Sequence, residues 1–162
     1  MMLNRLKVLR LRGDDTPNFQ KAFRRMNFQK ALEKNTTIHE LDLSHAFSKH
    51  SDGIRMQNRT KQALAHVLKV GGLSNLRVLN LDGCTLGDAG ADMLLNALNE
   101  RPVEFDRILH INLTDNGLSS QMLDRFRREQ CNRTIESEYQ DDDSSDGDES
   151  ASEEPGESDE SV

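Results

Sequence analysis

Residues 76–86 read LRVLNLDGCTL and residues 108–118 read ILHINLTDNGL, so one phrase occurs twice in this chain. The apolar residues of the two segments coincide at the first, fourth, sixth and eleventh positions. Two apolar residues spaced two apart, such as Leu79 and Leu81, point to the same face of a short strand. A phrase of this length that returns after 32 residues is typical of a protein built from stacked structural repeats.

The ninth position of the phrase holds Cys84 in one copy and Asn116 in the other. We expect these small side chains at a corner, where they satisfy the turn backbone before Leu86 and Leu118 re-enter the core. The pattern resembles the leucine-rich repeat. The long step, with helix-forming apolar residues behind the strand, resembles the ribonuclease-inhibitor-like subclass, and we take those residues to be Leu94, Ala97 and Leu98.

The same template fits two earlier segments, residues 6–11 and 38–43, although their corner positions hold Asp14 and Ala46 instead of Asn or Cys. The sequence therefore predicts an α/β fold, a short leucine-rich-repeat solenoid of about four strand–helix repeats. Capping and stop residues set the expected helix limits. The expected helices start at Thr16–Pro17, Thr60, Asp88 and Ser119 or Ser120, and the first three stop at Asn35, Gly71–Gly72 and Pro102.

The step between the second and third repeats is longer than the others, and the additional residues fall between Leu43 and Thr60. An insertion after a strand maps to one rim of a repeat protein, where partners often bind. We therefore expect the segment Ser44–Arg55 to form a rim loop. It is either a binding loop or a tolerated surface insertion.

Charge divides the chain into two parts. All 21 lysines and arginines precede residue 136, whereas 13 of the 28 acidic residues follow residue 135. The first part therefore has a net charge of +6 and the second of −13. The second part has too few large apolar residues to offset the entropy of ordering. The sequence predicts a leucine-rich-repeat domain over 1–135 and a disordered acidic Ser/Asp/Glu-rich tail over 136–162.

Serines in the tail lie next to acids at spacings that acidophilic kinases favour, because Asp148 follows Ser145 by three residues and Glu153 follows Ser150. We therefore expect Ser145 and Ser150 to be phosphosites, each adding about 1.5 to 2 negative charges. An arm this acidic would either capture a basic partner or mask the basic residues of the last helix. Those residues are Arg125, Arg127, Arg128 and Arg133.

The sequence does not predict catalysis, a metal site or a cofactor. His45 and His50 have no cysteine or carboxylate at metal-ligand spacing, and no Lys-Ser or Lys-Thr follows Gly71–Gly72 as a phosphate loop requires. No nucleophile stands beside a base in a recognisable motif. We therefore expect a protein that is not an enzyme.

Strand residues that alternate with the core leucines should face the open, concave side of the sheet. This row is polar and poor in aromatic residues, which suits a protein partner better than a small-molecule substrate or the bases of a nucleic acid. The residues expected to contact a partner are Arg10, Arg12, Glu40, Asp42, Asn80, Asp82, His110 and Asn112.

Cys84 and Cys131 are expected to be free thiols, because a bridge between a buried corner and the last helix would bend the repeat. No stretch of eighteen apolar residues is present, so we expect no membrane span. These features favour a cytoplasmic location, with the nucleus as the alternative. The first strand begins within ten residues of Met1, and we expect its open edge to pair with a partner, a second copy or further repeats.

Taken together, these features predict a non-enzymatic intracellular module for protein–protein interaction, an adaptor or assembly subunit whose acidic tail modulates binding. Long repeats followed by an acidic tail also resemble the Ran GTPase-activating proteins, a resemblance that implies GTPase activation as an alternative. Repeats with an acidic tail are similar to the acidic nuclear phosphoproteins as well. That second resemblance implies binding of basic proteins such as histones.

Overall fold

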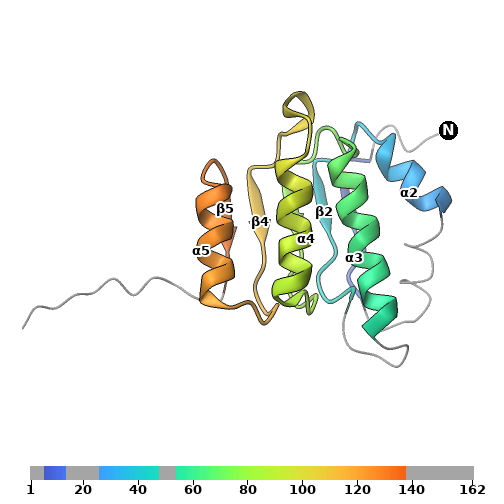
Figure 1. Cartoon of the computed structure of the whole chain (residues 1–162). Helices are drawn as coiled ribbons and strands as arrows, with labels where there is room; N and C mark the ends of the chain where they lie inside the picture. The colour runs from blue at the N-terminus through green and yellow to red at the C-terminus, as the bar shows by residue number, and fades with distance from the viewer. Residues whose placement is uncertain (1–5, 14–25, 48–53, 138–162) are drawn as a thin grey trace, which may run out of the picture.

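The computed structural model describes residues 6–13, 26–47 and 54–137 (Figure 1). These residues form an α/β fold around a five-stranded parallel sheet whose strands follow one another in chain order. Each strand has three residues. The strands are β1 (Val8–Arg10), β2 (Glu40–Asp42), β3 (Val78–Asn80), β4 (His110–Asn112) and β5 (Thr134–Glu136).

The helices lie side by side in a single layer that covers one face of the sheet (Figure 1). Each helix packs against the next one along the chain. The layer consists of α2 (Met26–Glu33), α3 (Ile54–Lys69), α4 (Gly87–Asn99) and α5 (Ser120–Glu129), and a short 3-10 helix, η1 (Val103–Phe105), follows α4. Among the described residues, no helix is long and apolar enough to cross a membrane.

Strand pairing keeps the apolar residues of the repeated phrase in one column. Leu9 pairs with Leu41, Leu41 with Leu79, and Leu79 with Ile111. The four strand positions that the sequence predicts are therefore confirmed. The sequence did not predict β5, in which Ile135 continues the column next to Ile111. It was missed because Asn132 and Ser137 replace the leucine or isoleucine residues that flank the central residue in the other repeats.

The core lies between the sheet and the helical layer. Strand residues at the fourth and sixth positions of the phrase point into it, and among them Leu41, Leu43, Leu79 and Leu81 are fully buried. Apolar residues of the helices face them, namely Leu64, Val67, Leu68, Leu94, Leu95, Leu98 and Phe126. Burial of each such side chain contributes about 1.5 to 3 kcal/mol. The core accordingly follows the apolar positions of the sequence.

Two of the expected helix starts are wrong. Thr60 lies inside α3, which already begins at Ile54, and its side chain is buried. The residues between them include Arg55, Met56 and Gln57, which favour helix, so the helix extends back into the expected insertion. Asp88 lies in the first turn of α4, and its carboxylate instead accepts a hydrogen bond from the Ser119 N–H at 2.8 Å.

The other helix limits agree with the sequence as far as they are described. Gly71, with φ of +79°, follows the end of α3, as expected for a glycine stop. Ser119 is the N-cap of α5 and accepts a hydrogen bond from the Met122 N–H at 3.2 Å. The expected start of the first helix, at Thr16–Pro17, lies outside the described residues. Within them, α2 begins at Met26.

The expected rim loop begins inside the core. Ala46 and Phe47, the third and fourth residues of the segment Ser44–Arg55, are buried, and Phe47 is fully so. Residues 48–53 lie outside the description. The start of this segment is thus a structural part of the second repeat instead of a free surface loop.

The expected boundary between domain and tail falls inside β5, which includes Glu136. Glu136 therefore belongs to the sheet and not to the tail. Residues 138–162, with the proposed phosphosites Ser145 and Ser150, lie outside the described residues.

Replacing a core leucine tests this packing. Because Leu81 is fully buried, we expect Leu81→Ala to lower the free energy of unfolding by about 2 to 5 kcal/mol. Leu109→Ala is a matched control, because Leu109 is exposed, and it should change the free energy by less than about 0.5 kcal/mol. Urea unfolding followed by circular dichroism measures both values. Equal effects of the two substitutions would contradict the register.

Candidate functional site

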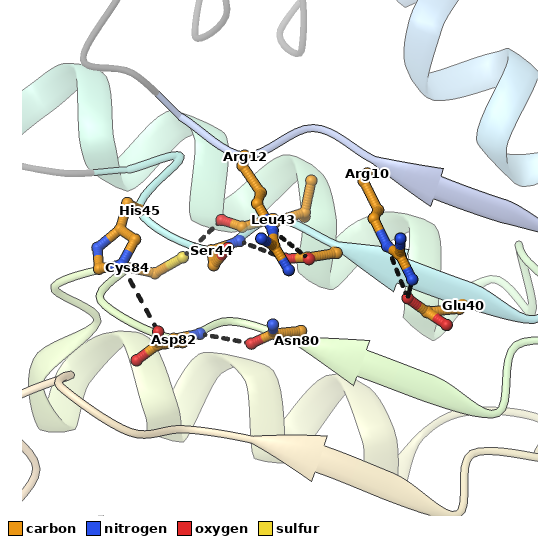
Figure 2. Close-up of polar contacts among 10 residues, drawn as sticks. Arg10, Arg12, Glu40, Leu43, Ser44, His45, Asn80, Asp82 and Cys84 are labelled. Carbon is orange, nitrogen blue, oxygen red and sulfur yellow. Dashed lines mark hydrogen bonds and ion pairs between the residues drawn. The ribbon is translucent and has the colours of Figure 1, made fainter.

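The corner residues Cys84 and Asn116 join successive strands. The Cys84 Sγ donates a hydrogen bond to the Leu43 carbonyl at 3.0 Å (Figure 2), and the Asn116 Nδ2 donates one to the Leu81 carbonyl at 2.8 Å. Both acceptors occupy the sixth position of the preceding repeat. Asn116 also accepts a hydrogen bond from the Leu86 N–H at 3.1 Å, so its buried amide binds the preceding repeat at two points. The corner role that the sequence predicts for the two residues agrees with these contacts.

The Cys84 thiol is in a chemically inert setting. Its burial raises its pKa to about 12, against smaller opposing contributions from nearby backbone N–H groups. The thiol therefore stays protonated near neutral pH and keeps its hydrogen to donate to Leu43. Both cysteines are free in the structure, and Cys131 is exposed.

On the open face of the sheet, the same local hydrogen bond recurs where the chain leaves β2, β3 and β4. The side-chain oxygen at the fifth position of three repeats accepts the backbone N–H two residues later, and these distances are 2.9 to 3.1 Å. Asp42, Asn80 and Asn112 are the acceptors. These side chains, which were expected to contact a partner, thus also shape the chain as it leaves each strand.

Ion pairs then cross from β1 to β2 (Figure 2). Arg10 binds Glu40 at 3.0 Å, and Arg12 binds Asp42 at 2.7 Å. Both arginines are exposed, but Asp42 is only 2 % exposed, which differs from the expectation that it would meet a partner directly. Asp42 acts instead by holding Arg12.

Further along the sheet, histidine side chains lie near carboxylates of the next strand or of the turn after it. His45 lies 3.6 Å from Asp82 (Figure 2), and His110 lies 3.3 Å from Glu136 on the next strand. The His45 ring fits because residue 83 is glycine. A Cβ there would lie 2.1 Å from the ring nitrogen Nδ1. Sequence reasoning missed His45 and Glu136, since both reach the face through turns and pairings that spacing does not reveal.

The structure therefore brings the eight expected face residues onto one surface, which we call the sheet face. Arginine–carboxylate pairs join β1 and its following residues to β2, and the helical layer lies on the other side of the sheet (Figure 1). Among the described residues, no group of three or more His, Cys, Asp or Glu side chains is placed to hold a metal ion. The chemistry available on this surface is hydrogen bonding and ion pairing.

Two hollows lie on the helical side of the fold, and the sequence analysis made no prediction about them. One, of about 460 Å³, lies between α2 and α3, and its lining includes Arg59, Gln62 and His66. A second, of about 300 Å³, lies between α3 and α4 and shares Gln62 and His66 with the first. Both have mixed polar and apolar linings.

Several arginines that the acidic tail was expected to mask already have partners. Arg125 pairs with Asp92 and with Glu129, and Arg133 pairs with Asp106. The Arg127 guanidinium donates a hydrogen bond to the Ser137 hydroxyl at 3.2 Å. These contacts leave Arg128 as the exposed member of the cluster for which no ion pair is described.

Comparison with known proteins gives no further assignment, because no protein-family model and no curated protein matches this sequence.

Asp42 should make the fold sensitive to acid. Burial alone would raise its pKa, but hydrogen bonds from the Ser44 N–H and from Arg12 outweigh burial and lower it. The carboxylate therefore stabilises the fold above its unfolded-state pKa, and this contribution is lost as the pH falls through the lower folded-state pKa. Asp42→Asn removes the contribution of this carboxylate to the pH dependence.

We expect the free energy of unfolding to fall less between neutral pH and about pH 3 in Asp42→Asn than in the wild type. Urea unfolding at the two pH values measures the difference. Asp124→Asn, which changes an exposed helix carboxylate, should retain the wild-type dependence. An unchanged dependence in Asp42→Asn would show that Asp42 is not stabilised in its charged form.

Thiol alkylation tests the corner. In the folded protein, iodoacetamide at mildly alkaline pH should modify the exposed Cys131 and spare Cys84, because only the thiolate reacts and the Cys84 thiol is buried and protonated. Peptide mass spectrometry reads the two sites separately. In concentrated urea both should react. Equal labelling of the two cysteines without urea would contradict the buried corner.

Proposed function

We propose that this chain is a leucine-rich-repeat protein of the ribonuclease-inhibitor-like subclass and that it acts as a non-enzymatic protein-interaction module. The repeated phrase, the in-register column of leucines and the corner hydrogen bonds of Cys84 and Asn116 support the family proposal. Each of these features follows from stacking one strand–helix unit on the next.

The observation that carries the functional proposal is the sheet face with its paired charges. Arg10 and Arg12 are exposed, yet the carboxylates of Glu40 and Asp42 fix the positions of their guanidinium groups. A fixed side chain loses less conformational entropy when it binds than a mobile one. Arginine is also enriched among the residues that dominate protein interfaces. The face thus offers pre-positioned donors to carbonyl and carboxylate groups of a partner.

The polarity of the surface favours a protein over a small molecule. Small-molecule sites are concave and mostly apolar, whereas the sheet face is lined by arginine, asparagine, histidine and carboxylate groups. Charged groups that complement those of a partner across an interface also select that partner and raise the association rate. We infer that the partner is a protein that carries acidic or carbonyl-rich segments opposite Arg10 and Arg12.

The acidic tail supports a second contact, with a basic partner. Twelve acidic residues follow Ser137, and no lysine or arginine follows Arg133. Because Arg125 and Arg133 are already paired, capture of a basic protein accounts for the tail better than masking of the last helix. This contact should weaken with salt, since salt screens the attraction between the exposed acids and a basic partner.

Partner binding by matched variants tests the proposal. Proteins bound to the full-length chain in cell extract would be identified by cross-linking and mass spectrometry, and the affinity of each purified partner would then be measured. We expect Arg10→Ala combined with Arg12→Ala to weaken binding by about tenfold or more, or about 1.4 kcal/mol. Lys30→Ala combined with Arg128→Ala, on the helical side, should leave the affinity unchanged.

The tail is tested separately in the full-length protein. Replacing the acids after Ser137 by asparagine and glutamine should abolish binding to basic partners and leave contacts of the sheet face unchanged. If neither set of variants alters the affinity of any partner, both proposed binding surfaces are wrong. Circular dichroism confirms that each variant folds before it is compared.

A further inference from the structure

The chain between α4 and β4 presents apolar side chains to solvent. This segment, Arg101–Leu109, is called the α4–β4 loop, and it rises beyond the ends of the helices at the top of Figure 1. Val103 is 87 % exposed and Leu109 58 % exposed, and Val70 and Phe105 are exposed large apolar residues as well. Single exposed apolar residues are ordinary, but several on one loop and the adjacent helix end indicate a contact surface.

A buried arginine holds this loop from beneath. The Arg101 guanidinium donates hydrogen bonds to the carbonyls of Leu68 and Leu73, at 2.7 and 3.1 Å, at the end of α3. It also donates to the Phe105 carbonyl at 3.0 Å. Arg101 is buried although it carries a charge, and one of its acceptors, the Leu68 carbonyl, lies in the last turn of α3, where a cation is favoured. The loop is thereby tied to the preceding repeat.

Two further contacts fix the loop. The Phe105 ring packs on Gly71, where a Cβ would lie 2.3 Å from a ring carbon. Asp106 pairs with Arg133, whose side chain is only 2 % exposed. Among the described residues, the Nε and Nη1 atoms of Arg133 are buried without a hydrogen-bond partner. Burying such charges is costly. These contacts hold the loop in place and leave Val103 and Leu109 exposed.

The charge around this surface is mainly positive. Strand register places Lys7, His39 and Arg77 in the row that continues into Leu109, and Arg107 lies within the loop. Lys7, Arg77 and Arg107 are exposed, and within the described residues none of them has an ion pair. Glu104, in η1, is the exposed acid of the loop. We call the apolar residues of the loop, Val70 and these basic side chains the strand-entry rim.

We propose that the strand-entry rim is a docking site for a partner protein segment in which large apolar side chains alternate with aspartate or glutamate. The apolar side chains would pack on Val103, Leu109 and Phe105, and the acids would pair with Arg77 and Arg107. The rim lies at the strand beginnings, apart from Arg10 and Arg12, so it can bind whether or not the sheet face does.

Other occupants fit the rim less well. The chain's own tail supplies acid but, from Gln140 on, has no aliphatic residue larger than alanine before Val162. A second copy would place like charges against like. An anionic membrane would meet Glu104 beside Val103 at the tip of the loop. A separate partner supplies both the apolar groups and the negative charge.

Selection from a random peptide display library tests the proposal. The full-length protein is the bait, and peptides that also bind the double variant carrying Val103→Ser and Leu109→Ser are removed. We expect the enriched peptides to combine leucine, isoleucine or phenylalanine with aspartate or glutamate. Their affinity should fall by about tenfold or more in the double variant, and also in Arg77→Glu combined with Arg107→Glu. Val8→Ser, an exposed valine on β1, is the matched control and should not change it.

The remaining outcomes overturn the proposal. No enrichment, or enrichment of basic peptides, would show that the rim is not such a docking site. If the protein bound phosphatidylserine vesicles and the Val103 and Leu109 substitutions abolished that binding, the rim would be a membrane contact. If the protein self-associated in sedimentation and the same substitutions abolished it, the rim would be a contact with a second copy. Tighter peptide binding after the tail acids are neutralised in the full-length chain would assign it to the tail. Val103→Leu should retain binding if the apolar contact is the cause.

Discussion

Parallel pairing in register is the constraint on which the rest of this structure depends. It stacks Leu41, Leu79 and Ile111 in one column, and the flanking leucines follow them into the core. A shift of one residue between two strands would turn every apolar side chain of a strand to solvent. The corner hydrogen bonds from Cys84 and Asn116 to the preceding repeat oppose such a shift, because their acceptor carbonyls would move with the strand.

The same register creates the sheet face. Side chains that alternate with the core leucines must point the other way, so residues of equal position in neighbouring repeats become neighbours in space. The side-chain contacts between neighbouring strands then run diagonally. Glu40 is in register with Val8 and reaches Arg10, and Glu136 is in register with Asn112 and reaches His110. An arrangement that keeps the core closed thus also orders the polar surface. This ordering is why we propose recognition of a protein partner and not chemistry for the face.

The segments between the repeated phrases are free of this constraint, and there the fold varies. The α4–β4 loop extends beyond the helical layer. Arg101, in the loop, binds the Leu68 carbonyl, and Arg133, outside it, pairs with Asp106 of the loop, so both contacts join residues far apart in the sequence. Such contacts add little to the core. They maintain an exposed surface in one shape, which reduces the entropic cost of binding there.

The sequence by itself determined the apolar column, the four strand positions, the corner residues and the charge division, because each follows from local spacing or from composition. It also selected the residues of the sheet face. Only the tertiary structure placed β5, whose flanking leucine or isoleucine residues are replaced, and buried Asp42 beneath Arg12. Likewise, the pairing of His45 with Asp82 and the support of the α4–β4 loop by Arg101 join residues from different repeats. Spacing within one repeat cannot encode contacts that form only when two repeats pack together.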